Sequence, residues 1–268
     1  MQIRIIRGIR VLSPIIFKYQ AASNHQRLES VTSSNPAYEN LKTILQFGAI
    51  ELKGQFTFGS NYTFLVDVCR EDKILPAVYK PSRGEQPLWD FPENSLALRE
   101  VAAYIVSESL GFHFVPFTVL RDEGPYGPGS LQQYIEYDPE YHYFNFSAED
   151  KARLMPVVLF DLLVNNADRK GSHVFFESDT KKLWAIDHGI CFHEEDKLRT
   201  VIWDFAGQKI PDELLSPLSR TRELRGLLEP YLNPDEISAL QTRADRLLAS
   251  KVFPRTPKDR RAFPYPPI

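Results

Sequence analysis

One change of character divides the chain into two unequal parts. Residues 48–136 are rich in β-branched and aromatic runs that are broken at glycines such as Gly54 and Gly59, a pattern typical of short β-strands joined by turns. One helix interrupts them, because "SLALREVAAYIVSESLGF" places apolar side chains near one face and ends at Gly111, a residue suited to a helix C-cap. From Ser147 onward the patterns are mainly helical. We therefore predict an α+β fold of two lobes: a small antiparallel-sheet N-lobe with one helix, and a larger, mainly helical C-lobe.

We predict four parts along the chain. Residues 1–40 form an N-terminal extension, residues 41–137 the N-lobe, residues 138–251 the C-lobe and residues 252–268 a proline-rich tail. The first twenty residues carry four basic side chains and no acidic one. This suits a targeting segment or a membrane-surface arm, but a continuous apolar stretch and a small-residue cleavage site are missing, so we interpret the extension as a flexible start. The sequence "VFPRTPKDRRAFPYPPI" predicts an extended tail rather than a packed element.

Charge, cysteine content and hydropathy exclude several classes of protein. The formal net charge is −3 and the pI is about 6.1, so the chain lacks the basic footprint of a nucleic-acid-binding protein and we expect no nucleic-acid partner. The only cysteines, Cys69 and Cys191, argue against a disulfide framework or a thiolate zinc site and fit a reducing, cytoplasmic location. No run approaches the roughly 20 apolar residues of a membrane-spanning helix, so we expect a soluble chain.

The stretch "VNNADRKGSHVFFESDTKKLWAIDHGICF", residues 164–192, concentrates polar side chains around two short apolar runs. The runs "HVFF" and "LWAI" are separated by "ESDTKK", which predicts an antiparallel hairpin. Since the entry and the exit of a hairpin lie side by side, Asp168 and Asp187 should converge at one end. Two neighbouring carboxylates repel unless a cation or a shared proton intervenes, and oxygen ligands suit Mg²⁺. The alternative is that both aspartates are only turn formers or caps.

A second pair of charged residues lies in the predicted N-lobe. Lys80 closes the short strand "PAVYKP", and Glu100 lies on the helix that follows. Phosphoryl transfer requires a cation on the nucleotide phosphates, a partner that holds this cation, and a loop that covers the phosphates. Taken alone, each residue is more simply interpreted as a solvated charge on a strand edge or a helix face. In combination with the two aspartates, the pair favours a phosphotransferase.

The order of these segments resembles the protein-kinase-like superfamily. Within it, the chain is similar to the bacterial phosphatidylinositol 3- and 4-kinase-like family and to type II phosphatidylinositol 4-kinases. The resemblance covers about residues 48–228, and it rests on "VYKPSRGEQPLWDF", "REVAAYIVSESLGFHFVPFTVL", "GSLQQYIE", "NNADRK", "AIDHGICF" and "VIWDFAGQKIPDELL". It implies a kinase that uses ATP and a divalent metal to phosphorylate a hydroxyl group.

The resemblance also implies roles for individual residues. Lys80 would contact the nucleotide phosphates and Glu100 would pair with it. Asp168 would orient the acceptor hydroxyl or take its proton, and Arg169 would support the loop or offset charge. Asp187 would bind Mg²⁺, with His173 as a second metal-binding position at which Mn²⁺ is the alternative ion. The nucleotide would also meet a phosphate-covering turn and an adenine-binding connector, which comprise Gly59, Ser60 and Asn61, and Gln132, Gln133, Tyr134 and Ile135.

Two histidines depart from the family pattern. His173 stands where the family has a metal-binding Asn, and an imidazole suits manganese better than magnesium. His188 replaces the small residue or Asn expected after Asp187. An alternative is a transition-metal site in which His173, His188 and His193 act together with the aspartates, although no spacing of the zinc-hydrolase type is present.

The acceptor is not identified by the resemblance. Type II lipid kinases have a cysteine-rich membrane-anchoring insertion, whereas only "SRGEQPLWDFPEN" separates Pro81 from Ser95 here, so peripheral membrane contact stays undecided. HipA-type toxin kinases, which share the superfamily, phosphorylate proteins. Candidate acceptor contacts, with ordinary solvated residues as the alternative, are Lys197, Arg199, Trp203 and Lys209. We expect a monomer that binds ATP and an acceptor on a lipid, a protein or a small molecule.

Two other functions are compatible with the same residues. A pseudokinase or regulatory module would bind nucleotide through Lys80 and Asp187 without transfer. His173 favours this alternative, whereas Asp168 would have no role in it. A nucleotidyl transferase would pass AMP to the acceptor instead of phosphate. The mass of the product distinguishes the three.

Overall fold

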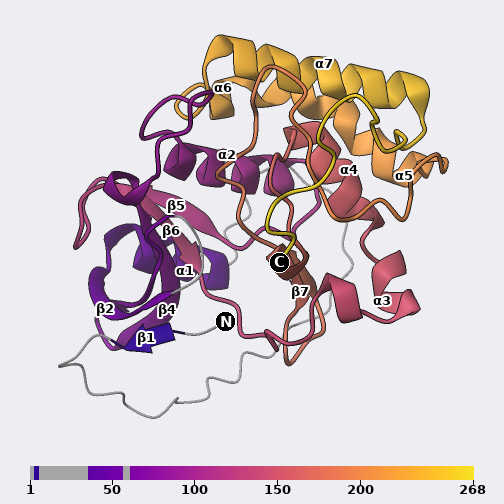
Figure 1. Ribbon diagram of the computed structural model, residues 1–268. Helices are drawn as coiled ribbons and strands as arrows, with labels where there is room; N and C mark the ends of the chain where they lie inside the picture. Colours follow the sequence, from indigo (N-terminus) through magenta and orange to yellow (C-terminus); the bar gives the residue numbers. More distant parts are fainter. Residues whose placement is uncertain (1–2, 6–35, 57–60) are drawn as a thin grey trace.

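The computed structural model describes residues 3–5, 36–56 and 61–268, which form a sheet-based lobe and a mainly helical lobe (Figure 1). Six strands form one antiparallel sheet in the order β1-β2-β3-β4-β6-β5. Their bounds are β1 (Ile3–Ile5), β2 (Ala49–Phe56), β3 (Phe64–Arg70), β4 (Lys73–Pro81), β5 (Thr118–Arg121) and β6 (Gly129–Gln133). The strand-rich region predicted from the sequence is confirmed.

Alternation of apolar and polar residues gives the sheet one fully buried face. In β3, Phe64, Val66 and Val68 are buried while the residues between them are half-buried, as expected where only one face of a strand meets a core. Helix α1 (Pro36–Phe47) lies against strands β3 to β6 and contributes Leu45 to the same core. Helix α1 was not predicted from the sequence. Its apolar residues recur at helical spacing, but the segment was assigned to the extension and to the start of the N-lobe.

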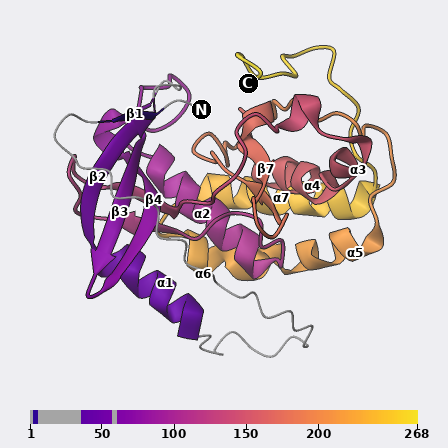
Figure 2. The same ribbon diagram turned by 90° about the horizontal axis from the view of Figure 1, so that it is seen from below.

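Helix α2 (Leu96–Ser109) lies between the sheet and the helical lobe (Figure 2). It packs against β5 and β6 and ends before Gly111, whose φ of 79° lies in the left-handed region that glycine adopts at helix ends. The helix and its terminal glycine are therefore as predicted. Ten of its side chains are buried, because it contacts both lobes.

The second lobe contains five α-helices, four of them short, and one hairpin within the described residues. Their bounds are α3 (Ala148–Ala152), α4 (Met155–Val164), α5 (Asp212–Leu215), α6 (Arg225–Leu228), α7 (Pro234–Ser250), β7 (Val174–Phe176) and β8 (Leu183–Ala185), with 3₁₀ turns between them. Strands β7 and β8 pair antiparallel, which confirms the hairpin predicted from "HVFF" and "LWAI". The Asn233 side chain accepts hydrogen bonds from the first turn of α7 in a capping box, which orients the longest helix of the lobe.

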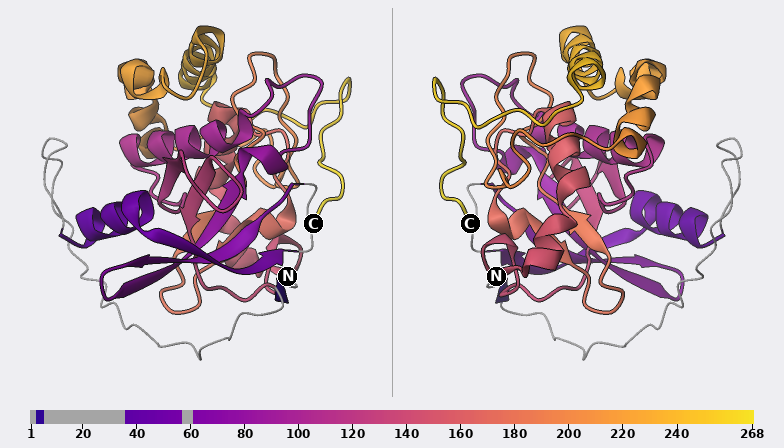
Figure 3. Two further views of the ribbon diagram at one scale, coloured as in Figure 1. Left: turned by 90° about the vertical axis from the view of Figure 1, so that its left-hand side faces the viewer. Right: turned by 90° about the vertical axis from the view of Figure 1, so that its right-hand side faces the viewer.

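The C-terminal segment, residues 252–268, is extended but packed, which corrects the expectation of an unpacked tail. It runs from the end of α7 along one edge of the molecule (Figure 3). The side chains of Phe253 and Ala262 are buried. The backbone N–H of Thr200 donates to the Ala262 carbonyl (3.1 Å), and that of Gly171 donates to the Pro267 carbonyl (2.8 Å). Prolines remove backbone donors but leave carbonyl acceptors, and the tail uses these acceptors on neighbouring loops.

Candidate active site

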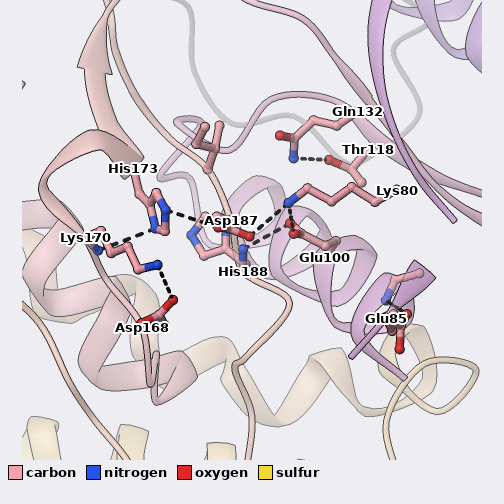
Figure 4. Close-up of polar contacts among 12 residues, drawn as sticks. Lys80, Glu85, Glu100, Thr118, Gln132, Asp168, Lys170, His173, Asp187 and His188 are labelled. Atoms are coloured by element: carbon pink, nitrogen blue, oxygen red, sulfur yellow. Dashed lines mark hydrogen bonds and ion pairs between the residues drawn. The ribbon is translucent and has the colours of Figure 1, made fainter. Parts of the chain in front are cut away.

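Three charged residues from both lobes meet around one ammonium group (Figure 4). Lys80, at the end of β4, lies with its Nζ 2.5 Å from Glu100 Oε1 and 3.0 Å from Asp187 Oδ1. Burial opposes the charged form of Lys80, but the carboxylates of Asp187 and Glu100 outweigh it and raise its pKa. The strand Lys and the helix Glu, whose pairing was implied by the family resemblance, are thus in contact, and Asp187 joins them.

Glu100 is held by more than its ion pair. Its carboxylate is buried, and Oε2 accepts a hydrogen bond from the backbone N–H of His188 (3.1 Å). At the start of α2, the Glu85 carboxylate accepts from the N–H groups of Leu96 (3.1 Å) and Ala97 (3.0 Å), where the helix dipole favours an anion. Burial nevertheless raises the pKa of Glu85. These contacts fix the position of α2 relative to the segment that carries Asp187.

Arg99, the neighbour of Glu100, connects α2 to the second lobe. Its guanidinium is buried, donates to the Cys191 carbonyl (2.6 Å) and pairs with Glu236 in the first turn of α7. It also stacks on Phe91 at 4.7 Å from the ring centroid. Breaking a buried ion pair from one side costs about 3–5 kcal/mol. The Lys80–Glu100 geometry is therefore stabilised by the contacts of the residue next to Glu100 on α2.

Asp168 and Asp187 lie in one polar network at the mouth of the hairpin (Figure 4). Asp168 Oδ2 is 3.3 Å from Lys170 Nζ, and Asp187 Oδ2 is 3.1 Å from His173 Nε2. The backbone N–H of Lys170 faces His173 Nδ1 at 3.4 Å. The predicted convergence of the two aspartates is confirmed, with side chains of the same loop between them.

The two carboxylates differ in their protonation. Burial is the main influence on Asp168; together with the nearby charge of Asp187 it outweighs Lys170 and raises the pKa of Asp168 to about 6. For Asp187, burial acts in the same direction, but Lys80 outweighs it and holds the pKa below its usual range. The Asp187 side chain is 45% exposed, so part of this attraction is screened by solvent. A permanently ionised carboxylate thus lies beside one that titrates near neutrality.

His173 is a neutral imidazole in this setting. Burial lowers its pKa to about 4. Since Nδ1 faces the N–H of Lys170, the proton belongs on Nε2, which then donates to Asp187. Asp187 and His173 are adjacent, but both ring nitrogens of His173 are engaged in this tautomer, so binding a metal through Nε2 would require its proton to move to Nδ1 and the contact with Lys170 to break.

The alternative metal site built on three histidines is not formed. His188 Nε2 lies 2.7 Å from Arg169 Nη2 and is thereby occupied, and the His193 ring packs against Phe91. Among the residues that the structure describes, no group of three His, Cys, Asp or Glu side chains has the arrangement of a metal site. A metal here would have two protein ligands at most from this set, with the remaining positions open to phosphate and water.

Arg169 is fully buried and holds together the loop that precedes β7. It binds the Asp161 carboxylate of α4 through Nε (2.8 Å) and Nη2 (2.9 Å). Its Nη1 donates to the carbonyls of His173 (3.1 Å) and Ile186 (2.6 Å), one on each side of the hairpin. Of the two roles expected for Arg169, its contacts favour support of the loop.

The predicted nucleotide-side residues are only partly described. Gly59 and Ser60 lie outside the described residues. Asn61 Oδ1 accepts from the N–H of Gln86 (2.7 Å), which ties the turn between β2 and β3 to the segment after β4.

In the connector, Gln132 is buried and donates to Thr118 Oγ1 (2.8 Å). The N–H groups of Gln133 and Tyr134 donate to the carbonyls of Phe117 (2.8 Å) and Pro76 (3.1 Å), so they are used within the protein. The Ile135 side chain is buried.

The sheet gives this site an apolar wall. Leu65, Val78 and Gln132 are cross-strand neighbours on β3, β4 and β6. Val78 lies two residues before Lys80 and therefore projects from the same face. Leu65 and Val78 are half-buried, unlike the fully buried residues that alternate with them. They offer an apolar surface next to the Lys80 ammonium.

The candidate acceptor contacts are distributed over different neighbours. Lys197 pairs with Asp90 (3.3 Å) and Glu195 (3.0 Å). Lys209 is exposed and lies 4.0 Å from Asp212 at the start of α5. Arg199 is half-buried, and its backbone N–H donates to the Asn166 carbonyl (3.0 Å). Trp203 is half-buried, and its Nε1 has no hydrogen-bond partner in the described part of the chain.

Several residues of the site were not found from the sequence. The ammonium group of Lys170 lies next to the Asp168 carboxylate. Its position two residues after Asp168 in the chain could have indicated this contact. Glu85, Arg99 and Asp161 act through partners far away in the chain, and a charged residue with a distant partner has no periodic signature.

Comparisons with known proteins agree with this architecture. No protein-family model matches the chain. Protein Rv2133c of Mycobacterium tuberculosis (strain ATCC 25618 / H37Rv) is 35% identical over 263 residues, and the alignment covers 83% of this chain and 94% of that protein. The chain belongs to the family of this mycobacterial protein.

Solved kinase structures share the fold. The Helicobacter pylori proinflammatory kinase CtkA matches with a TM-score of 0.50 and 15% identity, covering 78% of this chain and 94% of that one. The Golgi casein kinase with Mn/ADP bound matches with a TM-score of 0.54 and 15% identity, covering 86% and 82%. The chain therefore has a two-lobed, protein-kinase-like α+β fold. Among its described helices, none combines the length and the apolar composition required to cross a bilayer.

Proposed function

We propose that this protein is an ATP-dependent, metal-dependent phosphotransferase that transfers the γ-phosphate to a hydroxyl acceptor. The observation that carries the proposal is the meeting of Lys80, Glu100 and Asp187 across the two lobes, with Asp168 in the same network. The kinase-like fold supports it. The family order of the segments around these residues favours the phosphatidylinositol 3- and 4-kinase-like type, with a lobe boundary after residue 137.

Each residue has a role that fits its surroundings. The Lys80 ammonium, held by Glu100, would bind the nucleotide phosphates, and the apolar face of Leu65 and Val78 would receive the adenine. Asp187 offers a partly exposed, ionised carboxylate that fits a divalent ion, and the neutral His173 imidazole beside it would join as a ligand through Nε2 once its proton had moved to Nδ1. When bound, Mg²⁺ or Mn²⁺ would supply positive charge to the phosphates. The Mn/ADP in the Golgi casein kinase structure supports this expectation.

Asp168 would act on the acceptor. Its carboxylate is 26% exposed, and its backbone N–H donates to Asn166 Oδ1 (2.9 Å), which fixes the loop. In the transfer, the acceptor oxygen forms a bond to the γ-phosphorus while the bond to the β-phosphate oxygen breaks and ADP leaves. The acceptor proton passes to the Asp168 carboxylate. With a pKa near 6, this carboxylate is mostly ionised at neutral pH and is a stronger base than an ordinary aspartate, as general-base catalysis requires.

The product identifies the reaction. Incubation with ATP and either Mg²⁺ or Mn²⁺, followed by mass spectrometry of the protein and of candidate lipid and small-molecule acceptors, should show an added phosphate and release of ADP. Addition of AMP with release of pyrophosphate would replace the proposal by nucleotidyl transfer. Unchanged acceptors and unchanged ATP would favour a nucleotide-binding pseudokinase.

His173 is the observation that favours the pseudokinase as second candidate. Because an imidazole suits Mn²⁺ better than Mg²⁺, we expect the wild-type protein to turn over ATP faster with Mn²⁺, and His173→Asn to shift the preference toward Mg²⁺ by about tenfold or more. The measurement is initial rate against metal concentration, with His193→Asn as the matched control. An unaltered metal preference in His173→Asn would exclude His173 from the metal site.

Replacing Lys170 should shift the pH dependence of the reaction. Asp168 must be ionised to accept a proton, so kcat/KM should rise with pH through about 6. The Lys170 charge opposes the upward shift of the Asp168 pKa, so Lys170→Met should raise this pKa and move the acidic limb to higher pH. The exposed Lys258→Met, in the C-terminal segment, is the control. If the limb stays in place in Lys170→Met, Asp168 is not the titrating group.

A further inference from the structure

A groove of about 550 Å³ lies in the second lobe, apart from the Lys80–Asp187 network. Its walls come from α4, α7, the segment at residues 196–207 and the C-terminal segment. Figure 3 shows the C-terminal segment continuing from α7 along the edge of the molecule. Of the residues considered above for phosphoryl transfer, Trp203, a candidate acceptor contact, lines it, whereas Lys80, Glu100, Asp168 and Asp187 do not. The volume is in the range of small-molecule sites, roughly 300–1,000 Å³.

The groove carries an excess of positive charge on a chain whose net charge is −3. Four arginines line it, together with one carboxylate, Asp196. Arg246 Nη1 lies 3.6 Å from this carboxylate, and Arg260 donates to the Asp196 backbone carbonyl. Arg255 is exposed and makes no hydrogen bond or ion pair among the described residues. One aspartate cannot balance four guanidinium groups.

The fourth arginine, Arg243, is buried and makes no direct ion pair with a described carboxylate. Its side chain is 6% exposed, Nε donates to the Leu163 carbonyl (2.9 Å) and Nη1 to the His193 carbonyl (3.1 Å). Its Nη2 has no partner within the described residues. Buried charges are normally paired, and burial lowers the pKa of Arg243 to about 10. The groove is thus lined by a buried cation that has an unused donor and no direct ion pair within the described residues, with the carboxylates of Asp196 and Glu236 nearby.

The remaining wall is apolar. Leu162, Leu247 and Phe253 line the groove, and Trp203 adds an indole whose Nε1 is also buried without a partner. Such a wall suits a ligand with an apolar body, while the arginines that line the groove suit several acceptor oxygens. Phosphate presents such oxygens, and guanidinium groups bind it in bidentate fashion.

We infer that this groove binds a phosphate monoester carried on an apolar body, with Arg246, Arg255 and Arg260 around the phosphate and with Trp203, Leu247 and Phe253 against the body. The site is separate from the proposed nucleotide site, so it does not depend on phosphotransfer. The ester is either a soluble molecule or the head of a lipid, since both present the same chemistry.

The test is calorimetric titration with phenyl phosphate, inorganic phosphate and benzyl alcohol. The titrated protein carries Lys80→Met, which removes the active-site cation. We expect one phenyl phosphate per chain, weaker binding of inorganic phosphate, and no measurable binding of benzyl alcohol. Arg246→Gln combined with Arg255→Gln should weaken phenyl phosphate binding about tenfold or more. These side chains are exposed and do not hold the core. Arg225→Gln, an exposed arginine outside the groove, should leave the affinity unchanged.

Three results would overturn the inference: no binding of phenyl phosphate, equal affinity in the groove variant, or loss of binding on introducing Lys80→Met alone. Cosedimentation with phosphatidylcholine vesicles that contain phosphatidic acid distinguishes the sources. Pelleting that requires Arg246 and Arg255 assigns the phosphate to a lipid, and phenyl phosphate binding without pelleting assigns it to a soluble ester.

Discussion

Asp187→Asn should abolish metal-dependent ATP turnover, with a loss of about 10²–10³-fold or more, the range found when a group that stabilises transition-state charge is removed. The substitution keeps the size of the side chain. Asn also tolerates the left-handed backbone at this position, where φ is 63°. The variant lacks the negative charge that would hold the metal and that pairs with Lys80.

The matched control is Asp179→Asn, an exposed aspartate in the turn of the same hairpin. It should retain wild-type turnover and wild-type metal dependence. Far-UV circular dichroism establishes that both variants are folded. Turnover of Asp187→Asn at the control's rate would remove this residue from the mechanism.

Asp168→Asn should also abolish transfer, but it should leave ATP binding intact. General-base catalysis contributes typically 10²–10⁴-fold, so kcat should fall by about that factor while the affinity for ATP and metal stays close to wild type. Single-turnover rates and nucleotide titrations measure the two quantities separately. Wild-type kcat in Asp168→Asn would exclude Asp168 as the base.

The same substitution should stabilise the protein above pH 6. Burial raises the pKa of Asp168 in the folded state to about 6, above its ordinary value of 3.8. The folded state then binds the proton more tightly than the unfolded state. Ionised Asp168 therefore costs stability above pH 6, and this cost disappears below pH 3.8. Denaturant unfolding at pH 8 and pH 4 should show Asp168→Asn more stable than wild type at pH 8, with the difference reduced at pH 4.

The parts of the site that were predicted from the sequence depend on residues close together in the chain or on the order of strands and helices along it. The apolar runs flanking "ESDTKK" predicted the hairpin, and the hairpin placed Asp168 and Asp187 at one end. Lys80 and Glu100 were assigned through the order of strand and helix and through a family resemblance. The structure confirms their contact.

The parts that were missed depend on packing between distant segments. Helix α1 has a short amphipathic pattern, which is too weak to predict a helix on its own. The helix is stabilised by the packing of its apolar face against the sheet. Arg99 reaches Glu236 across 137 positions of the chain, and Arg169 meets Asp161 and His188 inside the core. The tail was predicted to be unpacked because its many prolines lack a backbone N–H group. Its carbonyl oxygens nevertheless accept hydrogen bonds from the backbone N–H groups of Gly171 and Thr200.

The central claim is that Lys80 and Asp187 form a nucleotide and metal site, and a thermal-shift titration tests it directly. Wild-type protein is titrated with ATP alone, with Mg²⁺ and with Mn²⁺, and the series is repeated on Asp187→Asn and on the Asp179→Asn control. Ligand at 100 times its Kd stabilises the folded state by about 2.7 kcal/mol. We expect a clear rise in Tm that requires metal, persists in the control and is lost in Asp187→Asn. No rise with any nucleotide and metal, or an equal rise in Asp187→Asn, would contradict the account.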